Sequence, residues 1–162
     1  MKMIDFNASI ISYKSMGNIF VGENISLYIS ELYEHHDVSQ SNYYLPNEDC
    51  RIAYYIDNIL TIATLLDGTI ISIGCNEKYK GKYKNKLYSG MLMGELIKLT
   101  RSQRILNGSI IIDEDYGISF ILPSPYDEIA DYIEHIPLDL RISEIYVSDY
   151  SFWDRIKNSY SI

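Results

Sequence analysis

Apolar residues recur at helical spacing in three segments of the chain. The first stripe occupies positions i, i+3, i+4, i+7 and i+8, which are Ile25, Tyr28, Ile29, Leu32 and Tyr33. This spacing predicts an amphipathic helix, and Asn24 stands where its side chain would cap the first turn. The second stripe predicts a helix from Ser89 to about Thr100. Its apolar face comprises Leu92, Met93, Leu96, Ile97 and Leu99.

The third helix is predicted to begin at Ser124-Pro125. Serine is a favoured cap, and proline fits the first helical position because its missing N–H would have no partner there. The residues expected to face inward are Tyr126, Ile129, Ala130 and Ile133. Pro137 is expected to end this helix, since proline interrupts the backbone hydrogen bonds.

Short runs of β-branched and aromatic residues separated by turn signals predict strands in the middle of the chain. Residues 51–56 and 59–66 are two such runs, divided by Asp57-Asn58. Asp67-Gly68 is a favoured two-residue hairpin turn, and residues 69–73 follow it as a third run. We therefore predict an antiparallel meander of three strands.

A second hairpin is predicted from residues 109–112 and 118–122, joined by a turn at 113–117, and a last strand from 142–147. Residues 39–49 are polar and are predicted to form a long loop. Residues 79–86 alternate lysine with other residues, which is typical of a solvated loop or a fraying strand. The expected fold is α+β, with an antiparallel sheet of about five to seven strands and two or three helices.

The length and composition are those of one globular domain, which we expect to span residues 1–162. Hydrophobic residues make up 47% of the chain and charged residues 22%. No run approaches the roughly 18 apolar residues of a membrane helix, and Met1–Asn7 lacks the apolar run of a secretory signal. Cys50 and Cys75 are too few for a disulfide framework. We expect a cytoplasmic protein with free thiols and no membrane contact.

The net charge of −8 is distributed unevenly along the chain. Residues 1–77 carry net −7, residues 78–104 carry net +7, residues 105–150 carry net −9, and the last twelve carry +1. A sequence pI near 4.8 argues against nucleic acid as the main ligand, because phosphate binding needs a dominant basic face. The charge favours a cationic partner.

Patterns of catalytic and cofactor sites are missing from the sequence. There is no Gly-x-Ser-x-Gly elbow and no glycine-rich phosphate loop. His35 and His36 are adjacent, so on a helix they would not face each other as metal ligands. Their position at a helix end, like that of His135, suits an imidazolium that complements the helix dipole. We expect no catalytic residue, no metal and no cofactor, and hence a protein that is not an enzyme.

Carboxylates are concentrated in two segments. Asp113-Glu114-Asp115 falls in the turn of the second hairpin. Asp127, Asp131 and Glu134 are spaced to share one face of the third helix, with Glu128 beside it. Such clusters can be a solvated face, a docking surface for a basic partner, or a site for a divalent cation or catalysis. The spacing of an EF-hand calcium loop is missing, and the other three interpretations remain open.

The sixteen tyrosines suggest a contact surface, because tyrosine offers a large amphipathic area and is enriched at interface hot spots. Strands also favour tyrosine, so one member of each pair can simply point inward. The candidates for a contact role are Tyr43-Tyr44, Tyr54-Tyr55, Tyr146, Tyr150 and the single Trp153.

Three stretches carry a resemblance to a known family: SMGNIFVGENISLYISEL (15–32), LDGTIISIGCNEKYKGKYKNKLYSGMLMGELIKL (66–99) and DYGISFILPSPYDEIADYIEHIPLDLRISEIYVSD (115–149). Their order resembles that of small bacterial immunity proteins of contact-dependent growth inhibition systems. The resemblance implies a cytoplasmic protein, made beside a toxin, that binds the toxin's C-terminal domain and blocks its active site. Such toxin domains are often nucleases and basic where they grip phosphate, so an acidic inhibitor would mimic nucleic acid.

We therefore predict an immunity protein whose partner is a basic toxin domain of the nuclease type, without direct binding of nucleic acid. The predicted docking carboxylates are Asp113, Glu114, Asp115, Asp127, Glu128, Asp131 and Glu134. The predicted aromatic anchors are Tyr116, Tyr126 and Trp153. Two alternatives are a divalent-cation-dependent enzyme that uses the acidic cluster and a regulatory module that binds a small ligand between sheet and helices.

Overall fold

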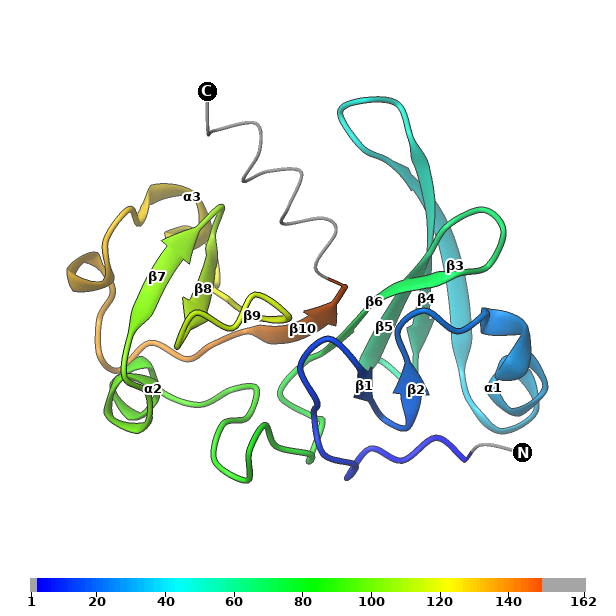
Figure 1. Ribbon diagram of the computed structural model, residues 1–162, viewed down its shortest axis with the longest axis horizontal. Helices are drawn as coiled ribbons and strands as arrows, with labels where there is room; N and C mark the ends of the chain where they lie inside the picture. Colours follow the sequence, from blue (N-terminus) through cyan, green and yellow to red (C-terminus); the bar gives the residue numbers. More distant parts are fainter. Residues whose placement is uncertain (1–2, 150–162) are drawn as a thin grey trace.

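The computed structural model describes residues 3–149 and shows an α+β fold built on one curved antiparallel sheet (Figure 1). Its eight strands lie in the order β3-β4-β5-β6-β10-β9-β8-β7. Their bounds are β3 Val38–Tyr44, β4 Cys50–Ile56, β5 Leu60–Thr64, β6 Ile70–Cys75, β7 Gln103–Leu106, β8 Ser109–Ile112, β9 Ile118–Ile121 and β10 Glu144–Ser148. The predicted fold class is confirmed.

The remaining elements are short and lie mostly along one face of the sheet. A two-stranded hairpin is formed by β1 and β2, and the helices include two 3-10 turns. The bounds are β1 Ser15–Met16, β2 Ile19–Phe20, η1 Ile25–Leu27, α1 Ile29–His35, α2 Met93–Leu99, α3 Tyr126–Ile129 and η2 Ile133–His135. Within residues 3–149, no helix has the length and apolar character needed to cross a membrane.

The last strand, β10, joins two meanders that are formed earlier in the chain. It pairs with β6 of the β3–β6 meander on one side and with β9 of the β7–β9 meander on the other. Ile145 and Val147 of β10 are fully buried. The two halves of the sheet are therefore held together by residues that come late in the sequence.

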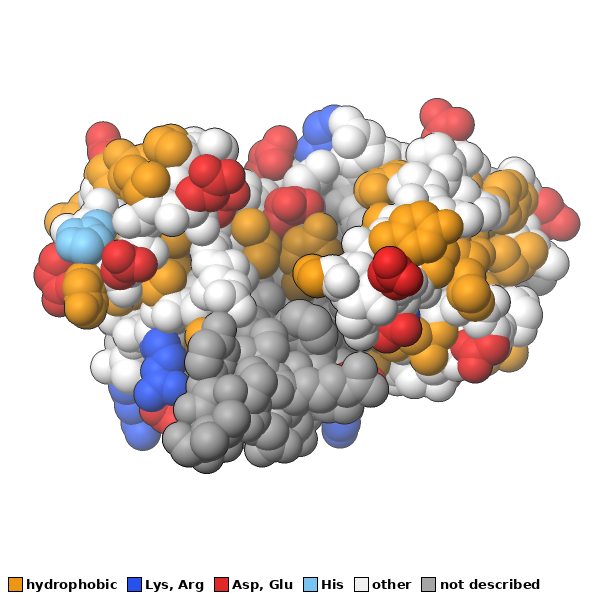
Figure 2. Space-filling view, turned by 90° about the horizontal axis from the view of Figure 1, so that it is seen from above, with side chains coloured by type: hydrophobic (Ala, Val, Ile, Leu, Met, Phe, Trp, Pro, Cys, Tyr) orange, Lys and Arg blue, Asp and Glu red, His pale blue; other side chains and the backbone are white. Residues whose placement is uncertain are grey.

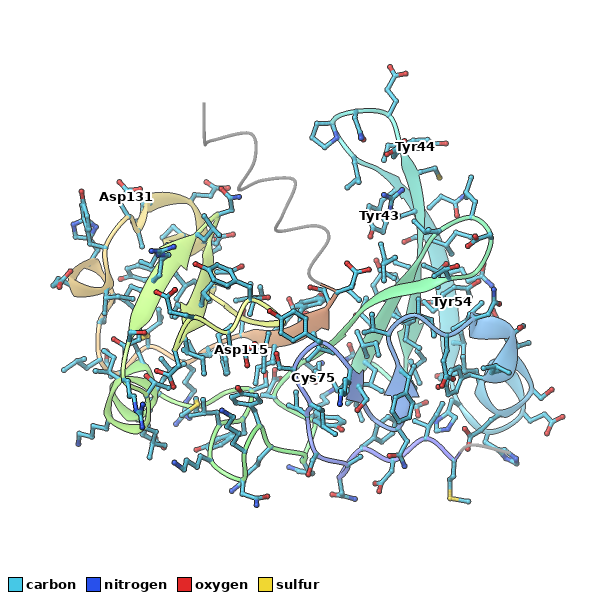
Figure 3. The ribbon with its side chains drawn as sticks, in the orientation of Figure 1. Tyr43, Tyr44, Tyr54, Cys75, Asp115 and Asp131 are labelled. Carbon is cyan, nitrogen blue, oxygen red and sulfur yellow. The ribbon has the colours of Figure 1, made fainter. Side chains whose placement is uncertain are left out.

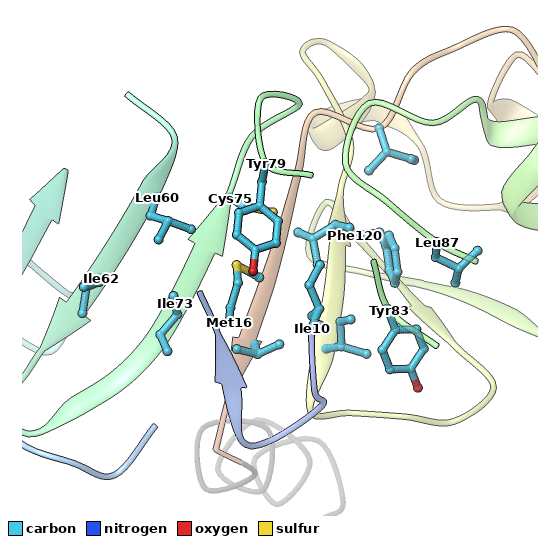
Figure 4. Close-up of a cluster of buried hydrophobic side chains, with 14 of the residues drawn as sticks. Ile10, Met16, Leu60, Ile62, Ile73, Cys75, Tyr79, Tyr83, Leu87 and Phe120 are labelled. Atoms are coloured by element: carbon cyan, nitrogen blue, oxygen red, sulfur yellow. The ribbon is translucent and has the colours of Figure 1, made fainter. Parts of the chain in front are cut away.

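One face of the sheet packs against the hydrophobic core. Its strands supply alternate apolar residues, among them Ile62, Ile73, Ile110, Phe120 and Ile145, all of which are fully buried. The covering elements supply Ile10, Met16 and Leu87, which Figure 4 labels. Leu32 and Met93 belong to the same core cluster. Burying each large apolar side chain contributes about 1.5–3 kcal/mol, so this face carries most of the packing energy of the fold.

The segment of residues 76–92 follows β6 and is a loop with its lysines exposed. A loop was predicted for its middle part, residues 79–86. Tyr79 and Tyr83 are nevertheless buried and hold the loop to the body, and Tyr88 is partly buried. The Tyr79 hydroxyl donates to the Ala8 carbonyl at 2.6 Å and accepts from the Gly17 N–H at 2.8 Å. Burial raises the pKa of Tyr79 above its usual value. The lysines of this loop therefore face solvent, whereas its buried tyrosines attach the loop to the rest of the fold.

The prediction of a loop over residues 39–49 is wrong for its first half, because residues 38–44 form β3. This strand pairs with β4 over seven residues but lies at the sheet edge, with six of its seven residues exposed. Neither face of β3 needs an apolar row, so its sequence lacks the alternation by which strands are recognised.

The third predicted helix is also corrected, since α3 is one turn long and η2 is separate from it. Ala130 adopts an extended backbone (ψ 119°) that ends α3. Pro125 is the N-terminal cap residue, no side chain caps the helix, and Ser124 therefore does not have the predicted role. Ile129 is exposed, contrary to the prediction, whereas Ala130 is buried as expected.

Two smaller differences concern the region around α2. The helix begins at Met93 rather than Ser89, because Ser89 and Gly90 form a turn and the cap residue Leu92 has a β conformation. Strand β7 was not predicted, because its four residues include Gln103 and Arg104 and expose part of their surface at the other sheet edge. The predicted apolar face holds for Met93 and Leu96, whereas Leu99 is exposed.

Candidate functional site

The β8–β9 turn uses two of its three carboxylates to build the fold. Asp113 accepts hydrogen bonds from the backbone N–H groups of Arg101 and Ser102, at 2.7 and 2.9 Å. Glu114 is exposed in this turn and has a left-handed backbone (φ 59°). Tyr116 accepts a hydrogen bond from Arg104 at 2.8 Å.

Asp115 has the most internal partners of these carboxylates. It accepts hydrogen bonds from Ser12 Oγ, from the Tyr83 hydroxyl at 2.6 Å and from the Gly117 N–H at 3.1 Å. These partners come from the N-terminal segment, the 76–92 loop and the turn itself. Asp115 therefore ties three parts of the chain together, which is a structural role rather than a docking role.

The predicted acidic residues do not form one surface. The β8–β9 turn lies at one end of β8, whereas α3 lies at the other end, where Asp127 packs on the backbone of Gly108. A strand of four residues spans about 13 Å, and Figure 3 shows Asp115 and Asp131 far apart. Because α3 ends at Ile129, Asp127, Asp131 and Glu134 do not share a helix face either.

Residues 126–139, which we call the acidic segment, present a mixed apolar and acidic surface. Ile129, Tyr132 and Leu138 are 61%, 65% and 64% exposed. The segment itself contains no lysine or arginine, and it carries five exposed carboxylates, Asp127, Glu128, Asp131, Glu134 and Asp139. Figure 2 shows acidic and hydrophobic side chains interleaved over this part of the molecule, at the left. Tyr126 is half-buried, and Trp153 lies outside the described residues.

The acidic segment is anchored to the body at intervals. Ala130 and Ile136 are buried in the core cluster, and Tyr126 and Ile133 pack against it. Gly108 brings the β7–β8 turn close to α3, because a Cβ at this position would lie 2.6 Å from the Asp127 carbonyl oxygen. The exposed apolar side chains are thus displayed from a fixed backbone.

The sheet face opposite the core is concave and encloses a hollow of about 520 Å³, which we call the concave hollow. It opens between the two halves of the sheet, on the side seen in Figure 2. Strands β3, β4, β6, β8, β9 and β10 all contribute to its lining. Four of the strand residues in this lining are serines: Ser72, Ser109, Ser119 and Ser148.

Two aromatic rings and a cation shape the walls of the concave hollow. Tyr146 covers Gly74 on the neighbouring strand so closely that a Cβ there would lie 2.3 Å from the ring. Tyr43 and Arg51 are register partners and point to the same side of the sheet. Burial raises the pKa of Tyr43, and the nearby Arg51 guanidinium partly opposes this rise.

Arg51 is a buried cation whose hydrogen bonds are incomplete. Its side chain is 14% exposed, and Nη1 donates to the Cys50 carbonyl at 3.1 Å. Nη2 lies 3.9 Å from Asp49 Oδ2, which is beyond hydrogen-bond distance. Nε is buried and has no hydrogen-bond partner among the described residues. Leaving a buried donor without a hydrogen bond costs about 1–3 kcal/mol of folding free energy, so an acceptor placed next to Nε would be stabilising.

Sequence reasoning missed the concave hollow, although a signal was present. Serine disfavours strands relative to β-branched and aromatic residues, yet it recurs in β6, β8, β9 and β10. Arg51 stood at the start of a run that was otherwise apolar or aromatic. Neither signal reveals a hollow on its own, because the sheet order that brings these positions together is non-sequential.

The histidines and cysteines have structural surroundings. His36 caps the C-terminus of α1 and donates from Nδ1 to Asp57 Oδ2 at 2.6 Å. Cys50 and Cys75 are free, and burial raises the pKa of Cys75 to about 12. In residues 3–149, no three His, Cys, Asp or Glu side chains are grouped so that they could hold a metal ion.

A second hollow has a basic lining. Lys80, Lys82 and Arg141 line this hollow, of about 530 Å³, with Tyr88 and Glu77. The Lys82 ammonium lies 5.4 Å from the centre of the Tyr88 ring. Comparison of the chain with family models, with curated proteins and with solved structures found no match.

Proposed function

We propose that this protein is an immunity protein, which binds the toxin domain of a contact-dependent growth inhibition system and blocks its active site. The observation that carries the proposal is the acidic segment, where three large apolar side chains stand exposed among five carboxylates. Exposed apolar groups gathered on a fixed backbone are typical of a surface that a partner covers.

The charge of the acidic segment indicates the kind of partner. Five negative charges without a lysine or arginine would repel an acidic protein and attract a basic one. A nuclease domain is basic where it holds the phosphates of its substrate. The segment would occupy that site as a mimic of nucleic acid, which agrees with the resemblance to immunity proteins.

The contacts within the fold narrow the predicted docking residues. Asp113 and Asp115 are committed to hydrogen bonds within the fold. The proposed contact set is therefore Asp127, Glu128, Asp131 and Glu134, together with Ile129, Tyr132 and Leu138. In this arrangement the apolar residues would set the lifetime of the complex, and the carboxylates would mainly set the rate of encounter.

The first test uses the toxin domain encoded beside this protein. Mixed in purified form, the two are expected to form a stoichiometric complex in which the toxin is inactive. The variant Asp127→Lys/Asp131→Lys should associate about tenfold more slowly at low salt, because it replaces attraction with repulsion. Stopped-flow fluorescence measures this rate.

A charge-matched control separates the local effect from the effect of net charge. Glu34→Lys/Glu77→Lys changes the net charge equally at exposed positions outside the acidic segment. This control should associate nearly as fast as the unmodified protein. Equal slowing in both variants, or slowing in neither, would remove the acidic segment from the proposal.

A further inference from the structure

We propose that the concave hollow is a second binding site, which takes a small organic anion with a flat apolar body and holds its acidic group on Arg51. This site is distinct from the acidic segment and does not depend on the proposed immunity function. The hollow is built by residues from six strands of the sheet, whereas the acidic segment follows β9 and carries α3.

The Nε and Nη2 edge of Arg51 specifies the acidic group. In a guanidinium, Nε and Nη2 donate in parallel from one edge, which matches the two oxygens of a carboxylate or sulfonate. Here Nη1 donates to the Cys50 carbonyl, Nη2 lies 3.9 Å from Asp49 Oδ2 in an ion pair without a hydrogen bond, and Nε has no hydrogen-bond partner among residues 3–149. An oxyanion in the hollow would supply the acceptor that this buried donor lacks.

The other charges of the lining limit the ligand to a single acidic group. Arg51 is the one lysine or arginine among the described lining residues. Asp149 also lines the hollow, so a second negative charge on the ligand would meet repulsion. A monoanion therefore fits better than a nucleotide with several phosphates.

The walls specify the rest of the ligand. Tyr43 and Tyr146 offer aromatic rings, and Leu45, Leu65 and Ile71 offer aliphatic surface. The strand serines place hydroxyl groups that can donate or accept hydrogen bonds. A volume of about 520 Å³ lies within the range of about 300–1,000 Å³ typical of small-molecule sites.

The site is tested by titrating the full-length protein with two fluorescent probes of similar shape. One is 8-anilinonaphthalene-1-sulfonate, which has a flat aromatic body and one anionic group. The other is N-phenyl-1-naphthylamine, which lacks the sulfonate. The unmodified protein should bind the sulfonate probe at one site, about tenfold more tightly than the neutral probe, because a hydrogen bond to a charged group is added.

Three variants locate the binding. Arg51→Gln should bind the two probes with similar affinity, because it loses the preference for the anion and keeps the affinity for the neutral probe. Ser119→Phe should weaken both probes, because Ser119 lines the hollow and the larger ring would fill it. Arg101→Gln, at an exposed arginine outside the lining, should change neither. Circular dichroism establishes that each variant is folded.

The proposal is overturned if the unmodified protein binds neither probe at a single site or binds both equally. It is also overturned if folded Arg51→Gln keeps the preference for the anion. If Arg51→Gln does not fold, Ser119→Phe decides: undiminished binding of the sulfonate probe would place it outside the hollow and reject the site.

Discussion

At the scale of single residues, the structure separates polar side chains that build the fold from those that stay exposed. Asp115 and Asp131 illustrate the difference, since both are acidic and both were predicted to dock. Asp115 accepts three hydrogen bonds from distant parts of the chain. Asp131 is exposed in the acidic segment. Sequence proximity to other carboxylates did not distinguish them, because the partners of Asp115 are up to 103 residues away.

Replacing Asp115 should therefore destabilise the protein. Asp115→Ala removes the acceptor for Ser12, Tyr83 and Gly117. We expect the free energy of unfolding to fall by about 2–3 kcal/mol, because partly buried donors lose their partner. Urea denaturation measures the change. Asp139→Ala, at an exposed carboxylate, should change stability by less than about 0.5 kcal/mol, and equal effects of the two substitutions would refute the structural role of Asp115.

Asp57 makes the free energy of unfolding depend on pH in the acid range. Burial would raise the pKa of its carboxyl, but hydrogen bonds from His36 and from the Asp37 N–H outweigh burial and hold the pKa below its usual value. A depressed pKa in the folded state means that the stabilisation is present above the unfolded pKa, near 3.9, and is lost as the pH falls through the lower folded value.

We expect Asp57→Asn to flatten this dependence. Urea midpoints measured from pH 6 down to pH 2.5 should fall less steeply for the variant than for the unmodified protein in the acid range. Asp139→Asn serves as the control and should follow the unmodified protein. Parallel acid profiles for Asp57→Asn and the unmodified protein would show that the carboxylate of Asp57 does not contribute.

At the scale of elements, the sequence predicts those strands and helices that bury one face. The meander from residue 51 to 75 was predicted because its apolar rows and its two turns are local signals. Both sheet edges, β3 and β7, were missed, because edge strands with solvated side chains have no such rows. The split between α3 and η2 was missed because tertiary contacts of Ala130 and Ile136 override the helical spacing.

The seam between β6 and β10 depends on close contact between Gly74 and Tyr146. A Cβ at Gly74 would lie 2.3 Å from the Tyr146 ring, so Gly74→Ala should cost about 1–3 kcal/mol by overpacking. The cost should be smaller when Tyr146→Ala is already present, since the ring that clashes has been removed. A double-mutant cycle of urea denaturation measures this coupling, and strictly additive effects would contradict the contact.

At the scale of the whole molecule, the acidic segment and the lysine-rich loop of residues 76–92 are separate parts of the structure. The acidic segment, which includes α3, carries five negative charges. The 76–92 loop, which contains five lysines, runs along the bottom of the view in Figure 1, whereas α3 lies at the top left. The sequence predicted this separation in outline, because the charges are blocked along the chain. It did not predict which carboxylates remain available, which depends on hydrogen bonds formed between remote segments.

The central claim is that the acidic segment is the docking surface. It is tested most directly by replacing two exposed tyrosines, one in each of two variants. Tyr132 in the acidic segment is 65% exposed, and Tyr44 at the end of β3 is 71% exposed. For the complex with the proposed toxin partner, Tyr132→Ala should raise the dissociation constant by about tenfold or more, and Tyr44→Ala should leave it unchanged. A weaker complex for Tyr44→Ala with an unchanged constant for Tyr132→Ala would place the interface elsewhere.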